Sequence, residues 1–396
     1  MRLESTPELE AFRQRVRAFI AEHAPGIKKH AGVRAPEPGL MPVIRTWTAK
    51  LYEAGFLGIN WPAEFGGRPD AHPLESFIVA EEIARARTWP PIGAASLASA
   101  AIIDFGTDEQ RERFLPRIRD CRDVWCQLFS EPGAGSDLAA LRTRARLEGE
   151  GADAVFVVDG QKVWTTNGQH ADMGYLLART DPDAAKHRGI TAFALDMRSP
   201  GVDIRPLREI TGTTDFNEVF LDGVRIPAAN VIGEVNNGWR VAMSSLGHER
   251  SGVAARGAEL LTTLDDLLRL AADTEVNGVA ALDDSATRQS IGELATRVHV
   301  NAAMINLAQS RMLNHTEQPA DAPLGKIFFS ELNHDLVDFG VRLQGVEGML
   351  TEADPDAVDG GWWQDAHLYS RAYTIAGGAN EILRTQIAER GLGLPR

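Results

Sequence analysis

The sequence is poor in cysteine, with only Cys121 and Cys126 in 396 residues. Two thiols cannot crosslink a chain of this length, which excludes a disulfide-stapled secreted scaffold and indicates a reducing compartment. The sequence has 41 basic and 55 acidic residues, which gives a formal net charge of −14. Because this charge would repel a phosphate backbone or an anionic membrane face, neither is expected as a partner. Runs of about eighteen apolar residues are absent, and the N-terminus lacks a signal-peptide core. We therefore expect a cytoplasmic protein with no membrane insertion.

Metal and mononucleotide signatures are missing as well. The cysteines are five positions apart, and the histidines do not pair with cysteine or carboxylate at ligand spacing, so we expect no metal site. There is no P-loop, and Gly133-Ala134-Gly135 is not a Rossmann fingerprint because no βαβ pattern surrounds it.

What the chain does contain is a three-part pattern. Apolar residues spaced three and four apart predict helices over roughly the first 120 residues, starting at Thr6-Pro7. β-rich runs follow from Ala154, and long helical stripes return after Gly238. We predict an α+β protein with an N-terminal α-helical domain, a middle antiparallel β-barrel or sandwich domain and a C-terminal four-helix-bundle domain. Their predicted limits are residues 1–122, 123–236 and 237–396.

Two Asp-Gly pairs mark the β region. The first β-rich runs flank Asp159-Gly160, which is typical of a two-residue hairpin turn, and Asp222-Gly223 interrupts the run Val219–Ile226. Short, regularly spaced runs favour an antiparallel barrel or sandwich over βαβ units. In the helical last third, residues 273–285 and 354–361 are predicted loops because they are polar and contain helix breakers.

Two strings carry the chemical signal. Residues 129–137 read Phe-Ser-Glu-Pro-Gly-Ala-Gly-Ser-Asp, in which glycines let backbone amides approach a ligand and Ser130 and Ser136 can each donate and accept. Out of context, such a string is most often a loop between domains. Residues 164–168 read Trp-Thr-Thr-Asn-Gly at a strand end, which suits a planar heterocycle such as an isoalloxazine, although Trp164 alone is typical of a core residue.

Together with residues 374–383, Thr-Ile-Ala-Gly-Gly-Ala-Asn-Glu-Ile-Leu, these strings resemble the acyl-CoA dehydrogenase family of flavoproteins. The likeness covers essentially the whole chain and includes Trp61-Pro62, Gly66-Gly67, Lys186-His187-Arg188-Gly189 and residues 391–396. The resemblance implies bound FAD, an acyl thioester on CoA or on a carrier protein as substrate, an electron-transfer flavoprotein as partner, and a homotetramer or heterotetramer.

The resemblance also implies roles for individual residues. On the flavin, the pyrimidine side and polar edge would meet Gln127, Phe129 and Ser130, and the other side Trp164 and Thr166. Elsewhere on the cofactor the implied contacts are Gln344, Gly345, Ala379 and Glu381. The implied substrate contacts are Ser136, Arg250 and the backbone N–H of Gly377, which would hold the thioester oxygen. The glycines near Gln344 equally fit close helix packing.

The catalytic base is the most specific expectation. Many family members carry a glutamate before the glycine of the C-terminal string, where this chain has Gly377. Isovaleryl- and long-chain-type members use instead a glutamate on the first C-terminal helix, which matches Glu249 in Gly247-His248-Glu249-Arg250. An apolar helical face would raise the pKa of such a carboxyl and suit it for removing an α proton. The alternative is a surface glutamate paired with Arg250 or Arg256.

Two departures from the family pattern keep other functions open. After Gly-Gly, where the family usually has a hydroxyl residue, this chain has Ala379. The Arg-x-x-Phe-Gly string that binds the cofactor's diphosphate in relatives is absent, and Arg288 is a possible substitute for it. An oxidase or monooxygenase on the same fold, and a non-catalytic or half-site subunit of a heteromeric enzyme, are therefore retained as alternatives. The acyl group is open too, since small residues at 94–100 suit either a bulky acyl group or tight helix packing.

Overall fold

The computed structural model describes residues 6–27, 30–247 and 252–395. They form two compact units, each assembled from separate stretches of chain. One unit contains Met1–Gly32, His72–Thr88 and Ser251–Arg396, and the other contains Val33–Ala71 and Trp89–Arg250. The predicted domain limits after residues 122 and 236 remain a prediction, because these units are groups of contacting segments rather than consecutive stretches.

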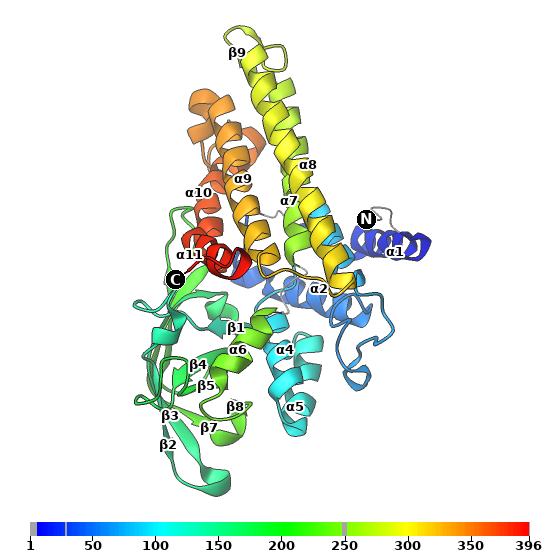
Figure 1. Cartoon of the computed structure of the whole chain (residues 1–396). Helices are drawn as coiled ribbons and strands as arrows, with labels where there is room; N and C mark the ends of the chain where they lie inside the picture. The colour runs from blue at the N-terminus through cyan, green and yellow to red at the C-terminus, as the bar shows by residue number, and fades with distance from the viewer. Residues whose placement is uncertain (1–5, 28–29, 248–251, 396) are drawn as a thin grey trace. The chain divides into compact units, whose positions relative to one another are not determined.

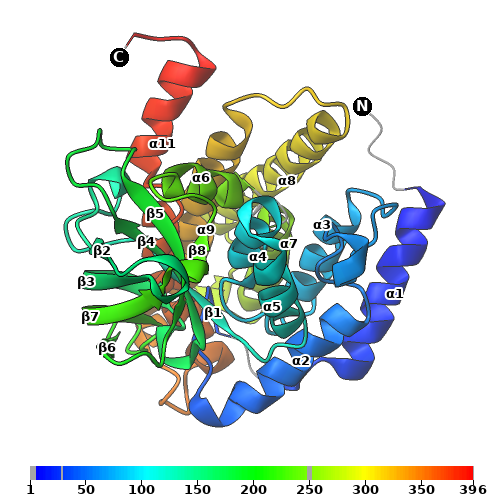
Figure 2. The ribbon, with the colours of Figure 1, turned by 90° about the horizontal axis from the view of Figure 1, so that it is seen from below.

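The second unit is built on one eight-stranded sheet, whose neighbouring strands lie side by side in Figures 1 and 2. Its order is β6-β7-β3-β2-β4-β5-β8, and β1 pairs with β4. Most pairs are antiparallel, as predicted, but β1 and β2 both run parallel to β4. The strand limits are β1 Trp125–Leu128, β2 Arg144–Glu148, β3 Val155–Thr166, β4 Met173–Arg179, β5 Ile190–Asp196, β6 Val202–Leu207, β7 Phe216–Pro227 and β8 Val231–Ile232.

The hairpin predicted at Asp159-Gly160 is wrong. Both residues lie inside the continuous strand β3, and neither has the positive φ that a type I′ turn requires. The register with β7 shifts at this point, so the pair forms a β-bulge. Asp222-Gly223 does not interrupt β7 either, because the Gly223 N–H donates to Asp159 Oδ1 at 2.8 Å across the bulge. The actual hairpin joins β2 to β3 through residues 149–154.

Four helices of the same unit pack with the sheet's core. They are α2 Met41–Glu53, α4 Ala95–Phe105, α5 Asp108–Arg119 and α6 Gly238–Gly247. Seven of the eleven residues of α4 are buried, and the helix packs in one core cluster with Phe114, Trp125 and Val241. This packing favours tight helix packing as the explanation of the small residues at 94–100.

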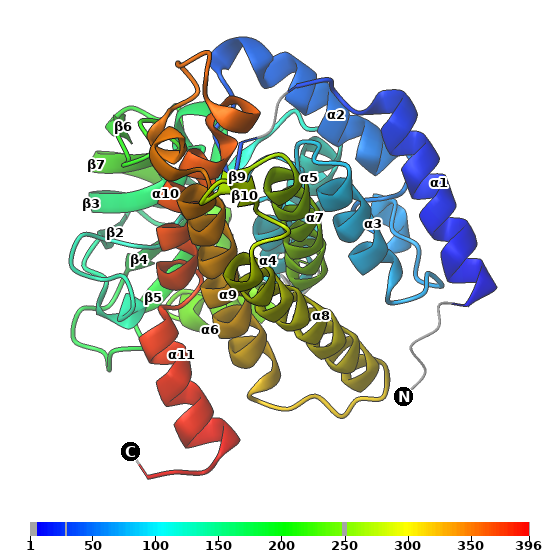
Figure 3. The ribbon, with the colours of Figure 1, turned by 90° about the horizontal axis from the view of Figure 1, so that it is seen from above.

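The first unit is a helical bundle, shown from two sides in Figures 1 and 3. Its helices are α1 Pro7–His23, α3 Glu75–Arg85, α7 Gly252–Ala272, α8 Ser285–Leu313, α9 Asp321–Leu343, α10 Trp362–Ile375 and α11 Asn380–Gln386. Helices α7 to α10 enclose the predicted four-helix core around buried Trp363. The predicted loop 273–285 contains a small hairpin, β9 Glu275–Val276 with β10 Val279–Ala280, because Asn277-Gly278 adopts the two positive φ angles of a tight turn.

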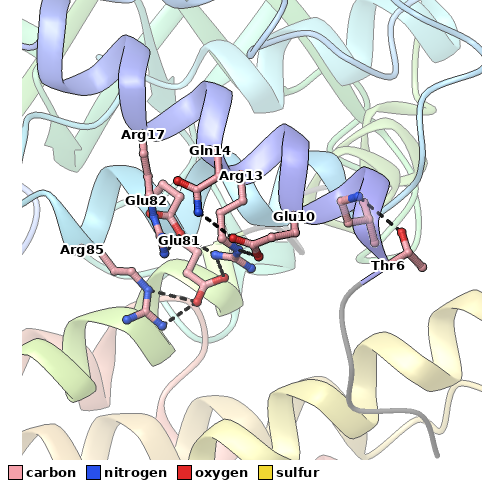
Figure 4. A network of polar contacts seen from close by, with 9 residues as sticks. Thr6, Glu10, Arg13, Gln14, Arg17, Glu81, Glu82 and Arg85 are labelled. Atoms are coloured by element: carbon pink, nitrogen blue, oxygen red, sulfur yellow. Dashed lines mark hydrogen bonds and ion pairs between the residues drawn. The ribbon is translucent and has the colours of Figure 1, made fainter.

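A buried carboxylate joins the two N-terminal helices of this unit. Thr6 caps α1 as predicted, and Arg13 and Arg17 of α1 both bind Glu82 of α3, which is 3% exposed (Figure 4). Burial acts to raise the pKa of Glu82, but the two guanidinium partners outweigh it and hold that pKa below its usual value.

None of the helices in the described ranges has the length and apolarity to cross a membrane. Within the same ranges, no group of three or more His, Cys, Asp or Glu side chains is placed to hold a metal ion. The cytoplasmic location stays a prediction.

Candidate active site

The loop after β1 is held by a buried ion pair that the sequence did not reveal. Lys162 of β3 is 0% exposed, and its Nζ donates to Glu131 Oε1 at 2.8 Å and to the Phe129 carbonyl at 3.0 Å. The Glu131 carboxylate also accepts the backbone N–H groups of Arg142 at 2.6 Å and Thr143 at 2.9 Å. One side chain therefore ties the start of the 129–137 string both to β3 and to the segment entering β2.

The electrostatics of this pair favour the charged form of both groups at neutral pH. Burial lowers the pKa of Lys162 to about 8, with the Glu131 charge opposing the shift. Burial acts to raise the pKa of Glu131, but the Lys162 charge and hydrogen bonds hold that pKa below its usual value. Among the described residues each group is the other's ion-pair partner, so removing one leaves the other charge buried without a counterion.

Trp164 is presented on a strained bulge next to this loop. The register between β3 and β7 shifts again between Lys162 and Thr165, and Trp164 has a φ of 59°, which is uncommon for a bulky residue. Its indole is 60% exposed and touches Phe216 edge-on, with ring centroids 6.1 Å apart. The core interpretation of Trp164 is therefore wrong, because the bulge turns the side chain out of the sheet.

A direct hydrogen bond brings the two predicted strings together. The Val163 N–H donates to the Ser130 carbonyl at 2.9 Å, so Ser130 lies beside the residue that precedes Trp164. Gln127 of β1 and Thr166 of β3 are half-buried. Phe129 is different, because its ring is 4% exposed and packs on Tyr175 at 4.9 Å. Its side chain belongs to the core, and only its backbone remains for a ligand.

A second buried ion pair lies near Thr166, at the end of β3. Arg34 donates to Asp215 Oδ2 at 2.9 Å, with both side chains 3% exposed. The Asp215 carbonyl accepts the N–H of Asn167, whose φ is 57°. Three buried polar atoms here have no partner among the described residues, namely Thr165 Oγ1, Asn167 Oδ1 and Asn217 Oδ1. Such unpaired groups are rare in finished cores and fit a place where a polar ligand binds.

The glycines of the first string face open space. A methyl group added at Gly133 or at Gly135 would meet no atom within 4 Å, although neither has a positive φ. Ser136 is exposed beside Asp137, which pairs with Lys186. The conformation of this loop therefore does not require glycine, and its backbone is open to a close approach from outside.

The C-terminal string belongs to the other compact unit. Gly377 and Gly378 have φ angles of 65° and 93°, and Gly377 is exposed with no atom within 4 Å of an added methyl group. A second lysine that the sequence did not single out supports this turn. Lys326 of α9 donates from Nζ to the Gly378 carbonyl and to Asn380 Oδ1, each at 2.8 Å. Ala379 stands at the N-cap of α11 without a side-chain cap bond, and Glu381 is exposed.

The remaining predicted positions are divided between the end of α9 and the undescribed residues. Gln344 ends α9 with its side-chain amide donating to the Gly340 carbonyl at 2.9 Å, and Gly345 follows with a φ of 60°. Glu249 and Arg250 lie outside the described residues, and their roles stay predictions.

These features suit a flat, polar-edged cofactor better than a compact one. The exposed indole, the open glycine loop and the unpaired buried oxygens lie on adjacent segments of one unit, and a planar heterocycle needs an apolar plate with donors and acceptors at its edge. The residues present therefore fit a flavin.

Comparison with known proteins agrees with this geometry. Residues 6–121, 126–224 and 236–392 match, in that order, the N-terminal, middle and C-terminal domains of acyl-CoA dehydrogenase. Acyl-CoA dehydrogenase IpdE1 from Mycobacterium tuberculosis is 37% identical, with 98% of each chain covered. Acyl-CoA dehydrogenase FadE34 of the same organism is 38% identical over 97% of this chain, which spans 51% of the length of FadE34.

Solved structures give the same result. The Tcur3481-Tcur3483 steroid ACAD is 29% identical with a TM-score of 0.87 over 100% of both chains. The ChsE4-ChsE5 complex from Mycobacterium tuberculosis is 30% identical with a TM-score of 0.85, also over 100% of both chains. The chain therefore has the three-domain acyl-CoA dehydrogenase fold, and it belongs to the acyl-CoA dehydrogenase family of FAD-dependent oxidoreductases.

Proposed function

We propose that this chain catalyses the α,β-dehydrogenation of an acyl thioester with Glu249 as the base. The proposal is supported by two neighbouring features, the loop containing Ser130, which Lys162 holds, and the Trp164 side chain, which turns out of the sheet. We call these two features together the platform. When bound, FAD would accept the hydride that leaves the β carbon, while the α proton goes to a carboxylate of the chain. The substrate thereby loses two electrons and two hydrogens to become the trans-2-enoyl thioester.

The residues of the chain divide the remaining work. The Ser130 hydroxyl, which makes no hydrogen bond to another described residue, would bind the polar edge of the flavin. Trp164 would cover the apolar face of the flavin. The Gly377 N–H would stabilise the negative charge that develops on the thioester oxygen as the α proton leaves. Gly377 has no side chain, so the carboxylate that accepts this proton must come from elsewhere in the chain. Glu249 is the residue whose sequence context matches that role.

For the acyl group, we propose a polycyclic or otherwise bulky chain. The support is an analogy with the Tcur3481-Tcur3483 steroid ACAD, which is similar to this chain in sequence over its whole length as well as in fold. Electrons would pass to an electron-transfer flavoprotein, the partner that the family resemblance implies.

A half-site subunit is the second candidate, and Ala379 favours it. Loss of the usual hydroxyl removes one hydrogen bond to the cofactor, worth about 1 kcal/mol. The ChsE4-ChsE5 complex is itself an assembly of two named chains, and a comparable partner would supply the missing contact. This candidate differs in one measurable respect, because the chain purified alone would carry little flavin and co-expression with its partner would restore it.

The test is anaerobic titration of the purified protein with straight-chain, branched and steroid-derived acyl-CoA thioesters. We expect the flavin's visible absorption to bleach with the polycyclic thioester at lower concentration than with the straight-chain one. Bleaching by none of the thioesters in protein that carries stoichiometric FAD would refute the proposed reaction. Where the flavin does bleach, timed reoxidation in air would separate an oxidase from a dehydrogenase.

A further inference from the structure

A cavity of about 250 Å³ opens between α7, α8 and α9, within one compact unit. None of its lining residues is among those expected to contact flavin or thioester. Most of its wall is apolar, formed by Met304, Ile305, Leu307, Ala308, Leu324 and Phe329. A cavity of this size is slightly smaller than a typical site for a drug-sized ligand.

Arg256 brings to this cavity a positive charge that has no ion-pair partner among the described residues. Its guanidinium carbon lies 5.5 Å from the centre of the Phe329 ring, and it makes no ion pair with any carboxylate of the described residues. Arg311, at another part of the wall, differs because Asp321 pairs with it. Half-buried arginines are normally paired, so Arg256 has unused capacity to bind a carboxylate in two-pronged fashion.

Lys326 adds a second cation with a spare donor. An ammonium has three N–H groups, and the acceptors found among the described residues are the Gly378 carbonyl and Asn380 Oδ1. Burial and then the nearby Arg256 charge lower the pKa of Lys326 to about 8, while the Glu381 and Glu331 carboxylates oppose part of that shift. The two cations therefore repel each other across the cavity wall, and an anion placed between them would relieve that repulsion.

Asn301 completes the polar end. Its side chain is 2% exposed, lines the cavity, and its Oδ1 has no hydrogen-bond partner within the described part of the chain. Because amide oxygen and nitrogen are interchangeable by rotation about the last bond, this group can present either a donor or an acceptor to a ligand.

We infer that this cavity binds a small amphiphilic carboxylate, with the head group at Arg256, Lys326 and Asn301 and the alkyl part along Ile305 and Phe329. A purely apolar ligand would leave the Arg256 guanidinium, the third N–H of Lys326 and the buried Asn301 amide oxygen without partners among the described residues, which is costly. An inorganic anion would leave most of the wall empty, so the combination of charge and apolar lining selects a fatty-acid-like molecule. This inference does not depend on the proposed reaction.

The test uses decanoate carrying a terminal photoreactive diazirine, applied to the flavin-loaded protein as purified, with the labelled peptides located by mass spectrometry. Competitors are decanoate and its uncharged analogue decanol. Arg256→Met removes the charge, and Ala308→Trp fills the cavity without touching a charge. Arg144→Met is the matched control, because Arg144 is exposed and has no ion pair among the described residues.

We expect label within residues 301–329, displaced by decanoate at roughly tenfold lower concentration than by decanol, because a charge-assisted hydrogen bond is lost with the alcohol. The label should disappear in both Arg256→Met and Ala308→Trp and persist in Arg144→Met. Three outcomes would each overturn the inference: no label in residues 301–329, equal competition by the two ligands, or undiminished labelling in Arg256→Met. If Arg256→Met does not fold, Ala308→Trp decides alone.

Discussion

Lys162→Met should destabilise the protein strongly, and adding Glu131→Gln should recover much of the loss. The single change leaves the Glu131 carboxylate, which is 8% exposed, without the cation at 2.8 Å, a situation that costs about 3–5 kcal/mol. In the double variant the buried charge is gone, and the amide oxygen of the new side chain replaces only one of the two carboxylate oxygens that accept the N–H groups of Arg142 and Thr143. What remains is the loss of that one acceptor and of the donor to the Phe129 carbonyl, each worth about 1–3 kcal/mol.

The assay has two readouts, because folding and cofactor binding should separate. Urea unfolding followed by circular dichroism measures stability, and titration of the flavin-free protein measures the dissociation constant for FAD. We expect the double variant to fold yet bind FAD more weakly than the natural protein, since the loop containing Ser130 has lost one tie to β3. A Lys162→Met protein as stable as the natural one, or a double variant with unchanged FAD affinity, would refute the reasoning.

Three further predictions follow from single positions. Trp164→Gly relieves the strain of a φ of 59°, so the free energy of unfolding of the flavin-free protein should stay within about 1 kcal/mol of the natural value. FAD affinity should fall roughly tenfold because the indole is lost. Unchanged affinity in a flavin titration would contradict the role of Trp164 in the platform. Gly160→Val places Cβ 2.4 Å from Thr143 Oγ1 and should lower the free energy of unfolding by about 1–3 kcal/mol. Gly133→Ala brings its methyl group within 4 Å of no atom and should leave stability unchanged. Equal melting temperatures for the two variants would count against the packing at the bulge. Lys326→Met removes one hydrogen bond to the Gly378 carbonyl and one to Asn380 Oδ1, and it should lower kcat more than FAD content; a normal kcat would show that the turn needs no such support.

The fold was predictable because its main signals are periodic. Apolar stripes marked α1, α2, α7 and α8, and the three-part order of the chain followed from them. The Asp-Gly error at residues 159–160 has a physical cause. The same dipeptide that suits a hairpin turn also suits a bulge, and the choice depends on whether a neighbouring strand is present to pair across it.

The site was predictable only in part, for a related reason. Strings such as 129–137 and 164–168 identify chemistry through their residue types, but they do not say which side chains point inward. Phe129 is buried and Trp164 exposed because of a bulge that no local pattern announces. Lys162 and Lys326 were missed because a lysine is usually exposed, and their partners Glu131 and Gly378 lie 31 and 52 residues away.

We propose that Glu249 removes the α proton, and this role is open to a direct test. The measurement that tests it most directly is the anaerobic single-turnover rate of flavin bleaching by a reactive acyl-CoA, in natural protein, Glu249→Gln and the exposed control Glu234→Gln. We expect Glu249→Gln to keep its FAD and bind the thioester but to bleach at least about a hundredfold more slowly, while Glu234→Gln behaves as the natural protein. Bleaching of Glu249→Gln at the natural rate would contradict the assignment.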